Sequence, residues 1–68
     1  LRDYNQAIEL KPDYASAFNN RGIVKEDLGN LNSALADYNR AIELKPDYFK
    51  AIHNKKRVLE MITSSKNI

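Results

Sequence analysis

The chain has 68 residues, of which 43% are hydrophobic and 29% are charged, and its formal net charge is +2. It contains no cysteine, which excludes a disulfide framework, a thiolate nucleophile and a cysteine-based metal site. No apolar run approaches the roughly 18 residues of a membrane-spanning helix, so we expect no membrane partner. The sequence opens at Leu1 rather than Met and without a signal-like segment, so we expect a piece of an intracellular, cytoplasmic protein.

The first fourteen residues recur 34 positions later in the chain. Residues 1–14 and 35–48 are identical at 12 of 14 positions, and both end in Glu-Leu-Lys-Pro-Asp-Tyr. The stretches that follow, 15–34 and 49–68, agree at only four positions. A fixed period of this length indicates a repeat architecture, and divergence is expected in a terminal unit whose last helix must face water.

The first two elements are predicted to be helices separated by a short break. Apolar residues recur at helical spacing from residue 1 to residue 11. Pro12 ends this helix because it disfavours helical geometry in the residue before it, and the Asp13 carboxylate can cap the next helix. The second helix is predicted over about 14–28 and ends at Gly29, which tolerates a left-handed conformation.

Two further helices follow. The third is predicted to start after an N-cap at Asn30 and to end before Pro46, where the earlier Pro-Asp pair is repeated. The fourth carries apolar residues from Tyr48 to Ile62 and is expected to fray in the polar run that starts at Thr63. No segment shows sustained strand-like alternation, so the predicted fold class is all-α with four helices.

The period, the paired helices and the breaks between them resemble the tetratricopeptide repeat (TPR). In residues 15–48, Phe18 and Gly22 stand where this family has its large aromatic residue and its glycine. The small–aromatic–small series of the second helix is matched by Ala34, Tyr38 and Ala41, and Pro46 closes the unit. The small residues let paired helices approach closely, and Phe18 and Tyr38 fill the space between neighbours.

Two residues depart from the family pattern. Arg21 and Lys25 stand where the family often has apolar or aromatic side chains. We expect their aliphatic stems to cover the core while their charged heads reach water. The departures therefore concern local packing rather than the fold.

The resemblance implies a short right-handed α-solenoid. Residues 1–14 are expected to be the second helix of an incomplete repeat, 15–48 a complete repeat, 49–64 a terminal capping helix and 65–68 a frayed tail. The capping role follows from Lys56, which stands at the position of Gly22 and should block the close approach of a further helix.

No catalytic constellation is present in the sequence. It holds a single histidine, His53, with no cysteine, no glycine-rich phosphate loop and no paired histidine ligands. The acidic residues stand in helical contexts that favour surface ion pairs within one helix. We therefore predict a protein that is not an enzyme and has no cofactor or metal site.

The resemblance implies a protein-interaction scaffold, because the first helices of successive repeats in this family line a concave groove. Here those are the second and fourth predicted helices. Asparagine amides would bond a peptide backbone, and lysine and arginine would attract a carboxylate. The candidate partner-binding residues are Ser16, Asn19, Asn20, Ile23, Asp27, Lys50, His53, Asn54 and Arg57.

Some members of the family hold the C-terminal carboxylate of heat-shock chaperones in a clamp of Lys, Asn and Arg. Asn20 and Lys50 match two clamp positions, whereas Asn54 stands where the clamp has its Arg. The match to this ligand class is therefore partial, and the partner's identity stays open.

Two alternatives compete with groove binding. Homo-oligomerisation would bury the stripe of Leu1, Tyr4 and Ile8, which lacks an upstream neighbour. Nucleic-acid binding would use the basic segment 49–68, which carries five basic residues and one acidic residue. It is the less expected of the two, because that segment interleaves few aromatic residues.

Overall fold

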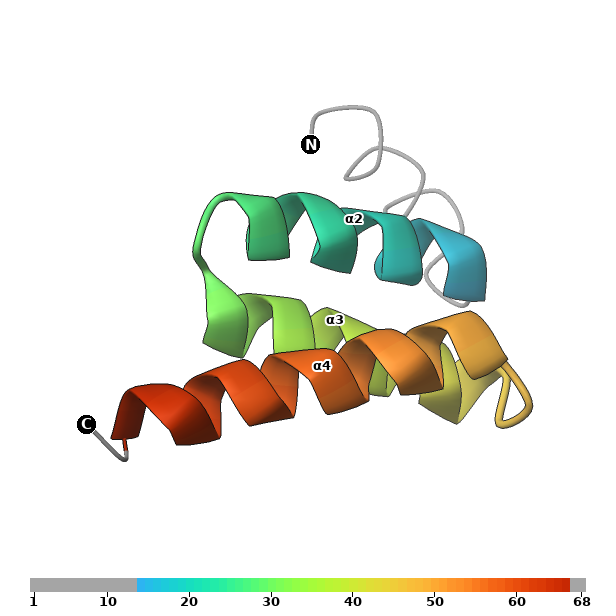
Figure 1. Ribbon diagram of the computed structural model, residues 1–68. Coiled ribbons are helices and arrows are strands. Elements are labelled where there is room, and N and C mark those ends of the chain that lie inside the picture. The colour runs from blue at the N-terminus through green and yellow to red at the C-terminus, as the bar shows by residue number, and fades with distance from the viewer. Residues whose placement is uncertain (1–13, 67–68) are drawn as a thin grey trace.

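The computed structural model describes residues 14–66, with side chains described as far as Ser64. Within that range the chain forms three helices and no strand: α2 (Ala15–Asp27), α3 (Leu31–Leu44) and α4 (Phe49–Lys66). Each helix runs antiparallel to the one before it, so that α2 and α4 point the same way, with α3 packed against both (Figure 1). The predicted helix at residues 1–11 lies outside the described residues.

The turn between α2 and α3 has the geometry predicted from its glycine. Gly29 has φ of 84°, in the left-handed region that an L side chain rarely adopts. Its N–H donates to the carbonyl of Glu26, and the N–H of Asn30 donates to the carbonyl of Lys25 at 2.8 Å. These two bonds form a Schellman motif, which satisfies carbonyls at the end of α2 and reverses the chain tightly.

The second break is produced by proline. Lys45, directly before Pro46, has φ of −144° and ψ of 89°, which lies outside the helical region that a following proline disfavours. Helix α3 therefore ends at Leu44, and α4 starts at Phe49 after a short turn. Helices α2 and α3 thus both lie within residues 15–48.

The ends of the helices differ in detail from the sequence prediction. Tyr14 is the N-cap of α2 and Asn30 that of α3, and neither side chain makes a capping hydrogen bond. The proposed capping residue Asp13 lies outside the described residues. Helix α4 continues through Ser65 to Lys66, so the fray predicted from residue 65 is wrong for these two residues. Three polar residues in a row do not end a helix that lacks a glycine or proline stop.

The core consists of two small clusters that join the helices. One contains Phe18 of α2, Ala41 of α3 and Ala51 of α4. The other contains Ala34 and Tyr38 of α3 with Val58 of α4. Alanines at the points of contact let the helix axes come close, while one aromatic ring fills each cluster. No helix in the described range is long and apolar enough to cross a membrane.

Candidate functional site

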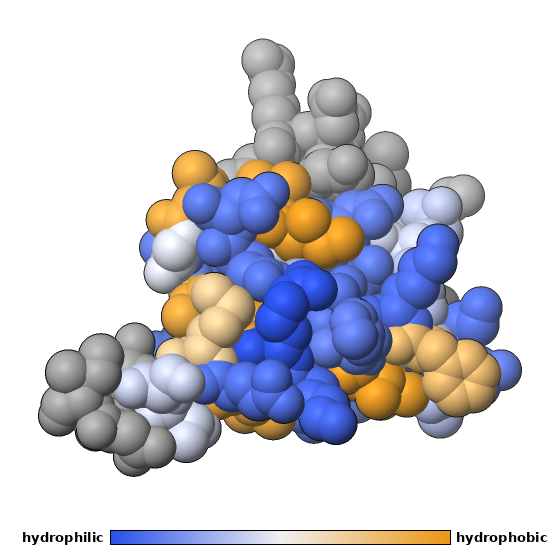
Figure 2. Space-filling model, viewed as in Figure 1, coloured by the Kyte–Doolittle hydropathy of each residue, from blue (hydrophilic) through white to orange (hydrophobic). Residues whose placement is uncertain are grey.

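A groove opens between the middle of α2 and the first turns of α4. It has a volume of about 430 Å³ and is lined by Asn19, Ile23, Phe49, Lys50, His53 and Asn54. Figure 2 shows hydrophobic side chains over α2 and near the start of α4 on this face, with a hydrophilic band between them. The surface therefore alternates apolar and polar character over a short distance.

Two asparagines form the floor of the groove. Asn54 Nδ2 donates to Asn19 Oδ1 at 3.0 Å, and the two residues are 8% and 2% exposed. A single bond of this kind leaves the NH2 group of one amide and the carbonyl oxygen of the other unused, whichever way the two amides face. Within the described residues no side-chain nitrogen or oxygen is both fully buried and unpartnered, so the unused groups reach the surface.

The walls of the groove combine apolar and cationic side chains. Phe49 is 76% exposed and Ile23 is 36% exposed, so both present apolar surface to the groove. Lys50 and His53 are exposed on the α4 side. Such a surface can take an apolar side chain next to an acidic one.

A three-helix junction lies beside this groove. Arg57 donates two hydrogen bonds of 2.8 Å to the carboxylate of Glu26, and the Tyr38 hydroxyl donates a third of 2.8 Å to the same carboxylate. The bond from Arg57 lowers the pKa of Glu26, against the opposing effect of burial and with help from Tyr38. Burial, and then the bond to Glu26, raise the pKa of the Tyr38 hydroxyl well above its ordinary value. The junction therefore ties α2, α3 and α4 together through one carboxylate.

A second carboxylate joins α2 to α3 away from the groove. Asp37 is 3% exposed and accepts two hydrogen bonds from Arg21, at 2.8 and 2.6 Å, while Lys25 Nζ lies 3.2 Å away. The bond to Asp37 raises the pKa of Arg21, outweighing the opposing effect of burial. Arg21 and Lys25 therefore both pair with a buried carboxylate, while their side chains remain partly exposed, at 21% and 24%.

The structure brings together five of the nine residues predicted for partner binding. Asn19, Ile23, Lys50, His53 and Asn54 line the groove, although the two asparagines bind each other. The other four are Ser16, Asn20, Asp27 and Arg57.

These four lie apart from the lining. Ser16 borders a different hollow, beside Tyr14 and Tyr48. Asn20 is half-buried on α2, and Asp27 is exposed at the end of that helix. Arg57 is bound to Glu26, so its charge is largely neutralised.

Sequence reasoning missed one lining residue and two structural carboxylates. Phe49 could have been found by comparing the two copies of the repeat. The matching position 34 residues earlier is the small Ala15, so the second copy has a large apolar side chain there instead. Asp37 and Glu26 carry no such signal, since their partners lie on other helices. Among the described residues no group of three or more acidic or histidine side chains is placed to hold a metal ion.

Comparison with known proteins gives one family assignment. The sequence profile of the tetratricopeptide repeat family matches residues 15–48, which is half of the chain and covers α2, α3 and the turns that end them. No curated protein and no solved structure gave a significant match. The match coincides with the antiparallel helix pair in which Tyr38 packs on Gly22. The chain therefore belongs to the tetratricopeptide repeat family.

Proposed function

We propose that the groove between α2 and α4 binds an extended segment of a partner protein. The observation that carries the proposal is the Asn19–Asn54 pair, whose unused donor and acceptor lie at the base of an apolar-walled groove. A peptide unit offers one carbonyl and one N–H, so it complements this pair. Two exposed apolar side chains beside the pair provide a contact for a side chain of the same segment.

A protein partner also agrees with the family. Tetratricopeptide repeats generally mediate protein–protein interactions and are typically non-enzymatic scaffolds. The alternating directions of α2, α3 and α4 agree with the stacked helix pairs of the proposed right-handed solenoid, in which α2 and α4 would share the concave side (Figure 1).

The charges favour a segment with an acidic residue next to an apolar one. Lys50 is exposed at the groove and supplies a positive charge there. The neighbouring Arg57 contributes little, because Glu26 already holds it at 2.8 Å. This reduces the support for the carboxylate clamp, which needs several free cations around one carboxylate.

The affinity should be low for this chain alone. The two groove helices offer only a few side chains to a partner. The area that these can bury is far below the roughly 1,200 Å² of a stable interface. We expect dissociation constants in the micromolar range or weaker, with tighter binding requiring further repeats.

The proposal is tested by selecting peptides on the 68-residue chain from a random extended-peptide library and titrating them into the ¹⁵N-labelled chain. The Phe49→Ala and Lys50→Gln variants should each bind the selected peptides at least about fivefold more weakly. The matched controls are Leu28→Ala and Lys56→Gln, which change exposed residues of the same types outside the lining. Peptides that lose affinity equally in control and groove variants would contradict the proposal.

The two alternatives have distinct readouts. The surface proposed for self-association, Leu1, Tyr4 and Ile8, lies outside the described residues and stays a prediction. Sedimentation equilibrium over a concentration series checks it, since groove binding requires only a monomer. Nucleic-acid binding is weakened as a hypothesis because the basic side chains of α4 diverge: Lys50 borders the groove, Lys56 borders a separate hollow and Arg57 is paired.

A further inference from the structure

A second hollow opens further along α4 and continues the surface that forms the groove. It has a volume of about 380 Å³ and is lined by Leu31, Arg57, Glu60, Met61 and Ser64. Three of these residues follow a groove-lining residue of α4 by seven positions, in the pairs Lys50–Arg57, His53–Glu60 and Asn54–Met61. Seven residues make about two helical turns, so the groove and the second hollow lie on one face of α4.

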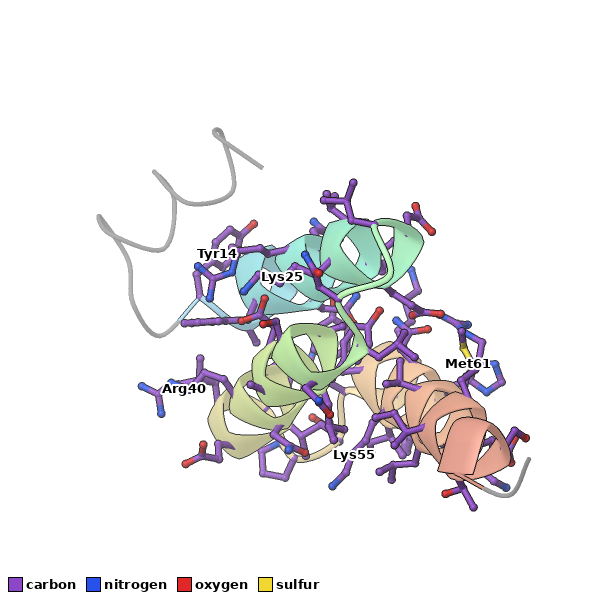
Figure 3. The ribbon with its side chains drawn as sticks, turned by 90° about the vertical axis from the view of Figure 1, so that its left-hand side faces the viewer. Tyr14, Lys25, Arg40, Lys55 and Met61 are labelled. Atoms are coloured by element: carbon purple, nitrogen blue, oxygen red, sulfur yellow. The ribbon has the colours of Figure 1, made fainter. Side chains whose placement is uncertain are left out.

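Apolar side chains mark both ends of this face. Figure 3 places Met61 on the side of α4 that is turned away from α3, and Lys55 on another side of the helix. Figure 2 views the side that carries Met61 and shows hydrophobic side chains towards both ends of α4, with a hydrophilic band between them. Met61 is 41% exposed, and it shares the second hollow with Leu31. The face therefore offers apolar surface at two places that a polar stretch separates.

The repeat indicates that a neighbouring helix would leave this face open. The positions 34 residues before Arg57 and Met61 are Ile23 and Asp27 on α2. Helix α4 packs next to α2, and yet Ile23 is 36% exposed and Asp27 is exposed as well. A helix that followed α4 in the same arrangement would therefore leave Arg57 and Met61 accessible to a ligand.

The two ends of the face differ in charge. Lys50 is exposed in the first turn of α4, where the positive end of the helix dipole adds to its charge. At the second hollow, Arg57 is already bound to Glu26, which leaves the exposed carboxylate of Glu60 as the uncompensated charge. Neither Lys50 nor Glu60 forms an ion pair among residues 14–64. The face is therefore positive at the groove and negative at the second hollow.

We infer that the partner segment has two parts and spans both hollows. Its first part places an acidic and an apolar residue in the groove, and its second part places an apolar residue on Leu31 and Met61 with a basic residue beside Glu60. The inference rests on the proposed function and adds to it the second contact and the order of charges. Seven residues of helix span roughly 10 Å, and an extended chain advances about 3.3 Å per residue, so the two apolar residues are separated by about three or four positions.

The test uses the peptides selected on the 68-residue chain, each titrated into the ¹⁵N-labelled chain. Their sequences should carry the second apolar residue at this spacing, and they should shift the amide signals of Leu31 and Met61 together with those of the groove. Met61→Ala should weaken these peptides about fivefold. The matched control is Leu59→Ala, which should leave their affinity unchanged. Leu59 is 42% exposed on the same helix and borders a different hollow.

The order of charges is tested separately with Glu60→Lys. This variant should bind peptides that carry the basic residue about fivefold more weakly at low salt, and it should prefer versions in which that residue is replaced by Glu. The control is Glu43→Lys, which reverses an exposed carboxylate on α3 that lines neither hollow and should change neither affinity. Circular dichroism checks that each variant is folded.

The outcomes separate this inference from the proposed function. Peptides that are weakened by Phe49→Ala and not by Met61→Ala would show that the groove binds alone, and the inference would be wrong. Equal losses in Met61→Ala and Leu59→Ala would also overturn it, as would an affinity that is indifferent to the sign of the charge at residue 60. Peptides that shift no groove signal at millimolar concentration would overturn both proposals.

Discussion

A Cβ atom on Gly22 would lie 2.6 Å from Cε1 and 2.9 Å from Cδ1 of Tyr38. The ring cannot move aside easily, because Tyr38 is fully buried and its hydroxyl is bonded to Glu26. The contact between these two residues sets how closely α2 and α3 approach.

Gly22→Ala should therefore destabilise the fold. In an open helix position this change stabilises by about 1 kcal/mol through helix propensity. Overpacking against a fixed ring costs roughly 1–3 kcal/mol and should exceed that gain. Urea denaturation should show the loss, and in a Tyr38→Leu background the penalty should shrink, since the ring atoms are gone. An alanine variant as stable as the parent in both backgrounds would show that the helices simply move apart.

The asparagine pair gives a second prediction about stability. Asn54→Ala removes the donor to Asn19 and should lower the free energy of unfolding by about 1–3 kcal/mol, because a buried carbonyl loses its partner. Asn19→Ala should cost a similar amount. The double variant should cost clearly less than the sum, and strict additivity measured by denaturation would mean that the bond is not what stabilises the α2–α4 contact.

Sequence reasoning recovers the breaks and the close approaches of this fold. The breaks at Gly29 and Pro46 each follow from the local chemistry of one residue type, and the close approach at Gly22 follows from the family resemblance. The bond between Asn19 and Asn54 joins residues 35 positions apart, so it depends on how two helices are rotated against each other. Helical spacing within one helix cannot supply that information.

The same limit applies to the ion pairs. Spacing rules describe pairs three or four residues apart on one helix, such as Arg40 and Glu43 at 3.8 Å. The shorter pairs of this protein connect different helices: Arg21 with Asp37, and Arg57 with Glu26. Spacing within one helix therefore does not identify these partners.

The buried carboxylate of Asp37 leads to a third prediction. Asp37→Asn removes the negative charge that pairs with Arg21 and Lys25, and it should destabilise the fold by about 2 kcal/mol. This loss is smaller than that for a fully buried ion pair, because both cations are partly exposed. The matched control is Asp27→Asn, at an exposed position, which should change stability by less than about 0.5 kcal/mol. Thermal or urea unfolding of the two variants and the parent measures both free energies of unfolding. Equal stability of the two variants would contradict the prediction.

Glu26 predicts how stability depends on pH. Its pKa is lowered below the ordinary 4.5, chiefly by the bond from Arg57, so the folded state binds a proton less readily than the unfolded state. Its contribution is therefore fully present above about pH 4.5 and is lost as pH falls through the lower folded value. Urea unfolding from pH 7 to pH 3 should show a shallower acid decline in Glu26→Gln than in the parent. Glu43→Gln, at an exposed carboxylate, should follow the parent curve; identical slopes for all three proteins would contradict the prediction.

Lys50 and Arg57 should separate binding from stability, although both are basic residues of α4. Arg57→Gln removes two hydrogen bonds to Glu26 and should lower the free energy of unfolding by about 1 kcal/mol, a modest amount because the arginine is partly exposed. This variant should leave the affinity of groove peptides nearly unchanged, because the Arg57 guanidinium is already paired with Glu26. Lys50→Gln should do the reverse, with unaltered unfolding and weaker binding of acidic peptides, most clearly at low salt. Denaturation and peptide titration on the same two preparations measure both effects. Equal loss of binding in the two variants would mean that Arg57 leaves Glu26 when a partner is bound, and that the groove uses both cations.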